Sequence, residues 1–125
     1  MNNDKLHIMI CGSRKNYNRE LVVQDITQTL VRYRDAIIHH GGAVGVDSIT
    51  ESCCKCFGIT TVIHKPDYEK YGKSAPLRRN EEMIAISDRI FAFWNGESPG
   101  TKFVINWAIE LKVPLVIFYE GKKHA

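Results

Sequence analysis

Short apolar runs recur along the whole chain and are separated by segments of mixed polarity. Five of these runs are rich in β-branched and aromatic residues, and they cover residues 6–11, 36–39, 60–64, 89–94 and 114–119. Each run is continuously apolar rather than alternating with polar residues, which is typical of strands buried on both faces of a sheet. The runs therefore predict five buried strands.

Apolar residues at helical spacing fill the segments between these strands. The pattern predicts four helices, whose apolar stripes are Leu21, Val22, Ile26, Leu30 and Tyr33; Ile49, Cys53, Cys56 and Phe57; Leu77, Met83, Ile84 and Ile86; and Phe103, Val104, Trp107, Ala108 and Leu111. Strands that alternate with helices form right-handed βαβ units, so the sheet is parallel and covered on both faces. The predicted fold class is α/β, a small doubly wound domain of about five strands.

Length and composition fit one such domain. The chain has 125 residues, of which 44% are hydrophobic and 25% charged, and this is enough for one core but not for two. We therefore expect a single domain over residues 1–125, with residues 121–125 as a loose tail. The apolar runs are far shorter than the ~20 residues that a membrane helix needs, and the first residues do not resemble a secretory signal. These features predict a cytoplasmic protein without a membrane span.

The net charge of +3 is too small to predict nucleic-acid binding by itself, but its distribution is uneven. Between Lys65 and Arg79 five basic residues stand against two acidic ones, and residues 12–19 carry three basic residues and no acidic one. Two compact basic segments favour a pocket for an anion over a broad face for a polyanion, provided that the fold brings them together. We therefore expect a small-molecule partner and not nucleic acid.

Four cysteines occur, at positions 11, 53, 54 and 56, and three of them fall within four residues. This spacing does not fit the disulfide framework of a secreted protein. Cys53 and Cys56 have the spacing of a redox or zinc half-site, for which His39, His40 and His64 would be candidate partners. The alternative is that the cysteines are small buried hydrophobes on one helix face. We expect the latter, with no metal and no cofactor.

The loop after the first predicted strand contains three residues that could contact a ligand. Gly12 lets the backbone approach closely, Ser13 supplies a hydroxyl, and Arg14 supplies a planar donor that suits phosphate. Gly12 could instead simply form the turn, with Arg14 solvated. Both interpretations stay open on the sequence alone.

The loop after the second predicted strand is rich in glycine and precedes a helix. Its backbone amides could point at an anion, together with the positive end of the following helix. Asp47 would be an awkward neighbour for phosphate, so it either caps the helix or binds a sugar hydroxyl. The loop is neither a P-loop nor a dinucleotide fingerprint. The expected contacts are Gly41, Gly42, Ala43, Gly45, Asp47 and Ser48.

A third candidate loop leads into the last helix. Gly96 and Gly100 permit close approach, while the hydroxyls of Ser98 and Thr101 and the free amides of the first helical turn can bind an anion. The alternative is a turn with a helix cap.

Residues 66–80 form a basic stretch that is long for a compact α/β domain, where connections are usually about two to six residues. Long loops tend to be lids or binding loops. Tyr68 or Tyr71 could stack on a base or a ribose, while Arg78 and Arg79 supply charge and Asn80 lies near a helix start. The alternative for the charged residues is a solvated surface.

Taken in order, four motifs resemble the YspA-like branch of the SLOG superfamily. They are Cys-Gly-Ser-Arg at 11–14, Gly-Gly-Ala-x-Gly-x-Asp-Ser at 41–48, Tyr-Gly-Lys-Ser-Ala-Pro-x-Arg-Arg-Asn-x-x-Met at 71–83, and Phe-Trp-Asn-Gly-x-Ser-x-Gly-Thr-Lys at 93–102. The superfamily also contains the Lonely Guy phosphoribohydrolases and DNA-processing proteins of the DprA kind. The resemblance implies a Rossmann-like fold, a nucleotide-type site at these loops and, frequently, a homodimer.

The chain departs from the Lonely Guy enzymes at the residues that carry their chemistry. Their glutamate at the ribosyl centre corresponds to Val104 here, and Arg79 is followed by Asn80 where these enzymes have an Arg-Lys pair. Cleavage of a glycosidic bond passes through an oxocarbenium-like state that needs a nearby carboxylate, which valine does not supply. Asp47 or Glu97 could replace it if either carboxylate faces the ribose.

These observations lead to three hypotheses. The leading one is a module that binds a nucleotide or a nucleotide-derived signal, with amides of residues 42–47 and 98–101 on the phosphate and Arg14 and Arg79 neutralising it. The second is an enzyme that hydrolyses the N-glycosidic bond of a nucleoside monophosphate or an ADP-ribose derivative, with Asp47 or Glu97 as the catalytic carboxylate. The third is a module that binds single-stranded DNA.

Overall fold

Six strands form one sheet in the computed structural model, which describes residues 5–119 and 122–124 of the chain. The strands lie in the order β3-β2-β1-β4-β5-β6. The first five pair in parallel, and β6 is antiparallel to β5. Their bounds are β1 (His7–Gly12), β2 (Ile37–His40), β3 (Thr61–Ile63), β4 (Arg89–Trp94), β5 (Leu115–Tyr119) and β6 (Lys122–His124). The predicted α/β fold class is confirmed.

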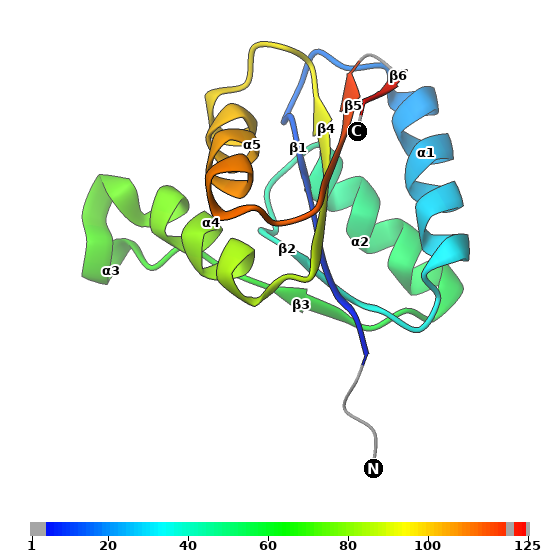
Figure 1. The fold of residues 1–125 in the computed structure, drawn as a ribbon, viewed down its shortest axis with the longest axis horizontal. Helices are drawn as coiled ribbons and strands as arrows, with labels where there is room; N and C mark the ends of the chain where they lie inside the picture. The colour runs from blue at the N-terminus through cyan, green and yellow to red at the C-terminus, as the bar shows by residue number, and fades with distance from the viewer. Residues whose placement is uncertain (1–4, 120–121, 125) are drawn as a thin grey trace.

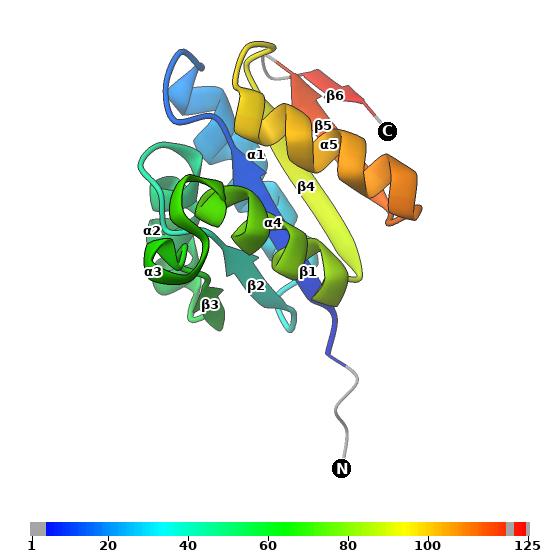
Figure 2. The same ribbon diagram turned by 90° about the vertical axis from the view of Figure 1, so that its left-hand side faces the viewer.

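Helices cover both faces of this sheet (Figure 1). On one face lie α1 (Arg19–Arg32) and α2 (Val46–Phe57), and on the other lie α4 (Ala75–Ile86) and α5 (Pro99–Leu111). Figure 2 shows α4 and α5 in front of the sheet, over the side where β1 and β4 lie next to each other. A short helix α3 (Tyr68–Tyr71) and a 3-10 turn η1 (Gly72–Ser74) precede α4.

Two separate cores hold the three layers together, one on each face of the sheet. Ile8 and Ile10 of β1 point into the core under α1 and α2, whereas Met9 and Cys11 point into the core under α4 and α5. Because both faces are buried, β1 needs apolar residues at successive positions. The same reason holds for β4, whereas β3 and β5 are only partly covered, so the prediction of buried strands is wrong for these two.

The strand order places a crevice between the loops that follow β1 and β4. The chain leaves β1 toward β2 on one side, and β4 lies on the other side, with Gly12 at the end of β1 opposite Phe93 of β4. In doubly wound sheets, ligands bind at this kind of switch point, outside the carboxyl ends of the strands. The loops after β1, β2 and β4 all open toward this edge.

Two predictions for the connecting segments were wrong. Residues 66–80 do not form a long loop, because the Asp67 side chain accepts a hydrogen bond from the Lys70 amide and starts α3, and Pro76 stands in the first turn of α4. In the expected loose tail, Lys122–His124 instead pair with β5 as β6, because the edge of β5 offers unpaired backbone groups. Positions 121 and 125 lie outside the described residues.

Across the described part of the chain, none of the helices has both the length and the apolar character that a bilayer crossing requires.

The close approach of β1, β4 and α2 depends on Gly12. A Cβ atom there would lie 2.6 Å from the Phe93 carbonyl oxygen and 2.6 Å from the Val46 side chain. We expect Gly12→Ala to lower the free energy of unfolding by about 1–3 kcal/mol, because neither the strand nor the buried valine can move freely. Urea denaturation measures the change.

The matched control for this variant is Gly100→Ala. A Cβ on Gly100 would meet open space, and alanine is the better helix former, so stability should stay the same or rise by up to about 1 kcal/mol. Equal stability of the two variants would contradict the close packing at Gly12.

Candidate functional site

A cavity of about 420 Å³ lies at the switch point, between the loops that follow β1 and β4 and the start of α4. The structure brings together at this cavity residues from all four motifs of the sequence. The predicted site residues that line it are Gly12, Arg14, Gly41, Ala43, Asp47, Arg79, Asn80, Glu97, Ser98, Gly100 and Thr101.

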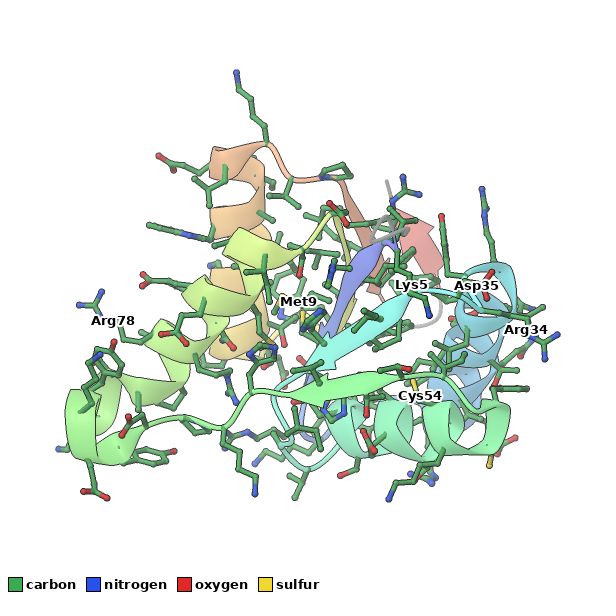
Figure 3. The ribbon with its side chains drawn as sticks, turned by 90° about the horizontal axis from the view of Figure 1, so that it is seen from below. Lys5, Met9, Arg34, Asp35, Cys54 and Arg78 are labelled. Carbon is green, nitrogen blue, oxygen red and sulfur yellow. The ribbon has the colours of Figure 1, made fainter. Side chains whose placement is uncertain are left out.

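Other predicted site residues do not line the cavity. Arg78 is exposed and contacts Glu81 at 3.4 Å on the same helix, and Figure 3 shows it on the outer side of α4, away from Met9. Tyr71 stays with Lys70 and Arg78, whose cationic groups approach its ring. The remaining residues in this group are Ser13, Gly42, Gly45, Ser48 and Gly96.

Ser13 joins two of the loops instead of facing a ligand. Its side chain is fully buried, and its hydroxyl accepts a hydrogen bond from the Asn95 amide at 3.0 Å. Its carbonyl accepts from the Val46 amide at 3.2 Å. Ser13 thus connects the start of α2 to the loop after β4.

Three amides of the glycine-rich loop already have acceptors within the protein. The amides of Gly41 and Ala43 both donate to Asp47 Oδ2 at 3.2 Å, and the Gly42 amide donates to His40 Nδ1 at 3.1 Å. The prediction that the amides of residues 42–47 hold a phosphate is therefore wrong for Gly42 and Ala43, whose amides already have acceptors in the fold. The glycines serve close packing: a Cβ on Gly45, where φ is +87°, would lie 2.6 Å from the Arg14 backbone.

Asp47 fastens the glycine-rich loop to α2. The N-cap of α2 is Gly45, and no side chain in the described structure caps this helix, so the interpretation of Asp47 as a helix cap was wrong. Burial raises the pKa of Asp47, while its two amide donors and the neighbouring His40 and Arg79 act in the opposite direction. The result is a buried carboxyl group in the wall of the cavity.

Arg79 reaches from α4 across the carboxyl edge of the sheet. Its side chain is only 8% exposed. Nη1 donates to the carbonyl oxygens of Gly41 at 2.8 Å and His64 at 2.9 Å, and Nε donates to Asn80 Oδ1 at 2.8 Å. Gly41 has no room for a side chain, because its Cβ would lie 2.5 Å from Arg79 Nη1. The guanidinium is therefore held in one position, next to Asp47 and the cavity.

The first turn of α5 forms the opposite side of the cavity. Asn95 Oδ1 accepts from the amides of Glu97 and Ser98, at 2.8 and 2.9 Å, which orders the loop. No described side chain caps the first turn of α5. The Ser98 and Thr101 hydroxyls lie 3.2 Å apart, and Thr101 is 4% exposed. An uncapped helix start with amides and hydroxyls suits an anion.

Several cavity residues were missed by the sequence analysis. Pro76, Leu77, Met83 and Val104 form an apolar part of the lining. They occur at helical spacing and therefore cannot be distinguished from core residues by pattern. Asn95 was also missed, because it resembles an ordinary turn residue. Its position directly after a strand was a usable signal. The remaining additional lining residues are Cys11, Lys15, Asn16 and Pro99.

The cysteines and histidines considered as metal partners lie apart. On α2, Cys53 is half-buried and Cys56 is exposed, so the expectation of a small buried hydrophobe is wrong for Cys56, whereas their neighbour Cys54 is fully buried in the core. His39 instead shares its face of the sheet with Met9, on the side of α4, and its ring contacts His7 and His64. Over residues 5–119 and 122–124, no group of three His, Cys, Asp or Glu residues could hold a metal ion.

Comparisons with solved structures show the fold of this domain. DNA processing protein A from Helicobacter pylori, described with a single-stranded DNA binding mode, matches with a TM-score of 0.69 and 21% identity over 90% of this chain. The molybdenum cofactor carrier protein of Chlamydomonas reinhardtii matches with 0.71 and 22% over 90%, and the molybdenum cofactor binding protein of Rippkaea orientalis with 0.70 and 15% over 94%. The chain therefore has the Rossmann-like α/β fold of these proteins.

This chain covers a different part of the length of each structural neighbour. This chain spans about 64% of the Helicobacter protein, 76% of the Chlamydomonas protein and 78% of the Rippkaea protein. No protein-family model matches the sequence. The Gene 61 protein of Mycobacterium phage D29 is 32% identical over 118 residues, which cover 89% of this chain and 94% of that protein. The chain belongs to the same family as this phage protein.

We expect Asp47→Asn and Asp47→Ala to differ in stability. Both amide donors use one oxygen, Oδ2, which the amide oxygen of asparagine can replace, whereas alanine leaves the buried Gly41 amide and the part-buried Ala43 amide without an acceptor. Asp47→Ala should therefore lower the free energy of unfolding by about 1–3 kcal/mol in urea denaturation. Ser48→Ala is the neighbouring control, with an exposed side chain and an expected change within about 0.5 kcal/mol.

The pH dependence separates the charge of Asp47 from its hydrogen bonds. Because burial raises the pKa of Asp47, the folded state binds this proton more tightly than the unfolded state. The contribution of Asp47 to stability is thus largest below the ordinary pKa of about 3.9 and declines as the pH rises through the raised pKa. Asp47→Asn should lack this decline. A wild-type profile parallel to that of Asp47→Asn would contradict the raised pKa.

Proposed function

We propose that this protein binds a nucleotide or a nucleotide-derived metabolite in the cavity at the carboxyl edge of its sheet. The observation that carries the proposal is the buried, fixed guanidinium of Arg79 in one cavity with the uncapped start of α5. A positive group that is held in place and a helix N-terminus together favour a phosphate.

The phosphate would lie at the first turn of α5, near Gly100 and Thr101. Arg14 also lines the cavity and can add a second positive charge from the loop after β1. The glycine-rich loop does not contribute its Gly41, Gly42 and Ala43 amides, since these have partners in the protein. The anion site is therefore built from the first and third candidate loops and from α4.

The base or another planar group would pack on the apolar part of the lining. Pro76, Leu77 and Met83 offer this surface from α4, whereas Tyr68 and Tyr71 do not line the cavity. We therefore replace the predicted tyrosine stacking with aliphatic packing. Ligand pockets of roughly 300–1,000 Å³ are usual, so a cavity of about 420 Å³ suits a ligand with one nucleotide unit better than a longer one.

We further propose that the chain is a single domain of the YspA-like branch and acts as a cytoplasmic homodimer, as its motifs imply. Support for the branch comes from the clustering of its motif residues around one cavity. The structural neighbours also favour ligand binding: by their descriptions, one binds single-stranded DNA and others bind or carry a molybdenum cofactor. These ligands differ, so the fold by itself does not select one.

The role of Arg79 can be tested against that of its neighbour Arg78. By isothermal titration calorimetry with adenosine monophosphate, Arg79→Ala should weaken binding several-fold to about a hundredfold, or about 1–3 kcal/mol, because a charge-assisted contact is lost. Arg78→Ala should leave the affinity unchanged, since Arg78 is exposed and does not line the cavity. Higher salt should weaken wild-type binding.

Two further arms make this experiment decisive. Arg79→Lys keeps the charge, and a thermal melt of each variant shows whether it is folded. A labelled oligothymidine in the same titration tests the single-stranded DNA hypothesis, which is favoured if it binds more tightly than the mononucleotide and Arg79→Ala removes that binding. Absence of binding by adenosine monophosphate, adenosine diphosphate ribose and the oligonucleotide alike would contradict the proposed function.

Hydrolysis of an N-glycosidic bond is the second candidate, because the buried carboxyl of Asp47 and the carboxylate of Glu97 line the same cavity. Val104 also lines it and offers only methyl groups, so we expect no free base after long incubation with nucleoside monophosphates, as measured by chromatography. Release of base that Asp47→Asn or Glu97→Gln abolishes would establish the enzyme instead.

A further inference from the structure

Three histidine rings form a hydrogen-bonded chain across the sheet. His7 Nδ1 lies 2.9 Å from His39 Nε2, and His39 Nδ1 lies 2.9 Å from His64 Nε2. The neighbouring ring centroids are 5.1 Å apart in both pairs. His7 is on β1, His39 is on β2 and His64 follows β3, so the rings connect three adjacent strands. We name these three residues the histidine chain.

The hydrogen bonds limit how many protons the histidine chain can hold. Each N···N contact needs one proton between two nitrogens, and a neutral ring carries one proton in total. One added proton is accommodated with both contacts intact, because it occupies the outer nitrogen that was bare. If His7 and His64 were both cationic, each would donate to His39, which would then have to accept at both nitrogens and carry no proton. The chain therefore accepts one proton and resists a second.

The surroundings disfavour additional charge on the central ring. His39 is 3% exposed, and burial, together with His64, His7 and His40, lowers its pKa to about 4. From α4, Glu82 and Arg79 face His64, where burial and Arg79 lower the pKa against the effect of Glu82. Next to His7, the Asp88 carboxylate accepts a hydrogen bond from the His7 backbone amide at 2.8 Å. Additional charge is therefore disfavoured on the central ring.

One end of the histidine chain is connected directly to the candidate anion site. The His64 carbonyl oxygen accepts from Arg79 Nη1 at 2.9 Å, and the same nitrogen donates to Gly41 in the cavity wall. A proton on the His64 ring adds a positive charge beside Arg79 without occupying the cavity. The site and the histidines thus share α4 as their common element.

We propose that the histidine chain is a single-proton site that regulates anion binding in the cavity through His64 and Arg79. This inference rests on the proposed function for its effect on a ligand, but the proton site itself does not. An added positive charge near the cavity favours an anion, and by reciprocity a bound anion favours the proton. Because burial and Arg79 lower the pKa of His64, the proton is taken up below the ordinary histidine value of about 6.5, and acidification into that range should strengthen anion binding.

The proton site is tested first in the ligand-free protein. Long-range proton–nitrogen NMR spectra report the protonation of each ring nitrogen as the pH is lowered from 7.5 to 5. We expect the three rings together to gain no more than one proton. Two rings that each become fully cationic by pH 5 in the folded protein would overturn the single-proton site, whatever the cavity binds.

The variant His39→Phe removes both ring-to-ring hydrogen bonds and keeps an aromatic ring of similar size. In this variant the ring-to-ring hydrogen bonds no longer limit the number of protons, so the two remaining rings can hold two added protons. Met9→Leu is the matched control, because Met9 is the register partner of His39 on β1 and carries no ionisable group, so its histidines should titrate as in the wild type. A thermal melt shows that both variants are folded.

The regulatory step is read from the affinity for adenosine monophosphate at pH 5.5 and 7.5. Wild-type affinity divided by that of His64→Phe removes the titration of the phosphate itself, because this variant lacks the ionisable ring beside Arg79 but keeps the backbone carbonyl that Arg79 binds; a thermal melt shows that it is folded. We expect this ratio to rise by about threefold to tenfold from pH 7.5 to pH 5.5. A constant ratio would overturn the coupling while leaving the proposed function intact. If no anion binds at either pH, the proposed function fails, and the NMR titration still decides the proton site.

Discussion

A buried guanidinium must be hydrogen-bonded, and the way in which Arg79 meets this requirement organises the functional edge of the protein. It comes from α4 and binds the carbonyl oxygens of Gly41 and His64, which follow β2 and β3. The Asp47 carboxylate, from α2, accepts hydrogen bonds from the amides of Gly41 and Ala43 on the other side of the same loop. One cation and one anion therefore fix a glycine-rich segment between helices on opposite faces of the sheet. Either charge alone would be costly to bury, which makes the pair and the loop a single structural unit.

This arrangement divides the cavity into parts with different chemistry. The buried charges and the uncapped start of α5 form a polar part, while residues from α4 and Val104 form an apolar part. A ligand with an anionic group on an organic body matches both. The structural neighbours use the same fold for DNA and for a molybdenum cofactor, so selectivity has to come from such local differences and not from the sheet.

The glycine-rich loop illustrates the limit of motif reading in this chain. Its composition correctly marks a place where the backbone must approach other groups closely, but the approaching groups are protein atoms: the Arg79 guanidinium at Gly41 and the Arg14 backbone at Gly45. The sequence of such a loop is the same whether its amides are free or already have acceptors in the protein. The difference depends on the position of the Asp47 carboxylate. The sequence analysis considered Asp47 as a helix cap or as a ligand of a sugar hydroxyl, and neither interpretation included its hydrogen bonds to the amides of the loop.

Local rules were sufficient for the parts of the fold that depend on burial and on backbone chemistry. Strands buried on both faces must be continuously apolar, and helices must present a stripe, so 6–11, 89–94 and the other runs determined the α/β class and the edge where the candidate loops gather. Tertiary structure alone decided which side chains meet there. Arg78 and Arg79 are indistinguishable in composition, yet one is exposed and the other lies in the cavity wall, because a helix turns by about 100° per residue and α4 has only one face against the sheet. The histidine chain has the same origin, since residues 7, 39 and 64 become neighbours only when the strand order places β1, β2 and β3 side by side.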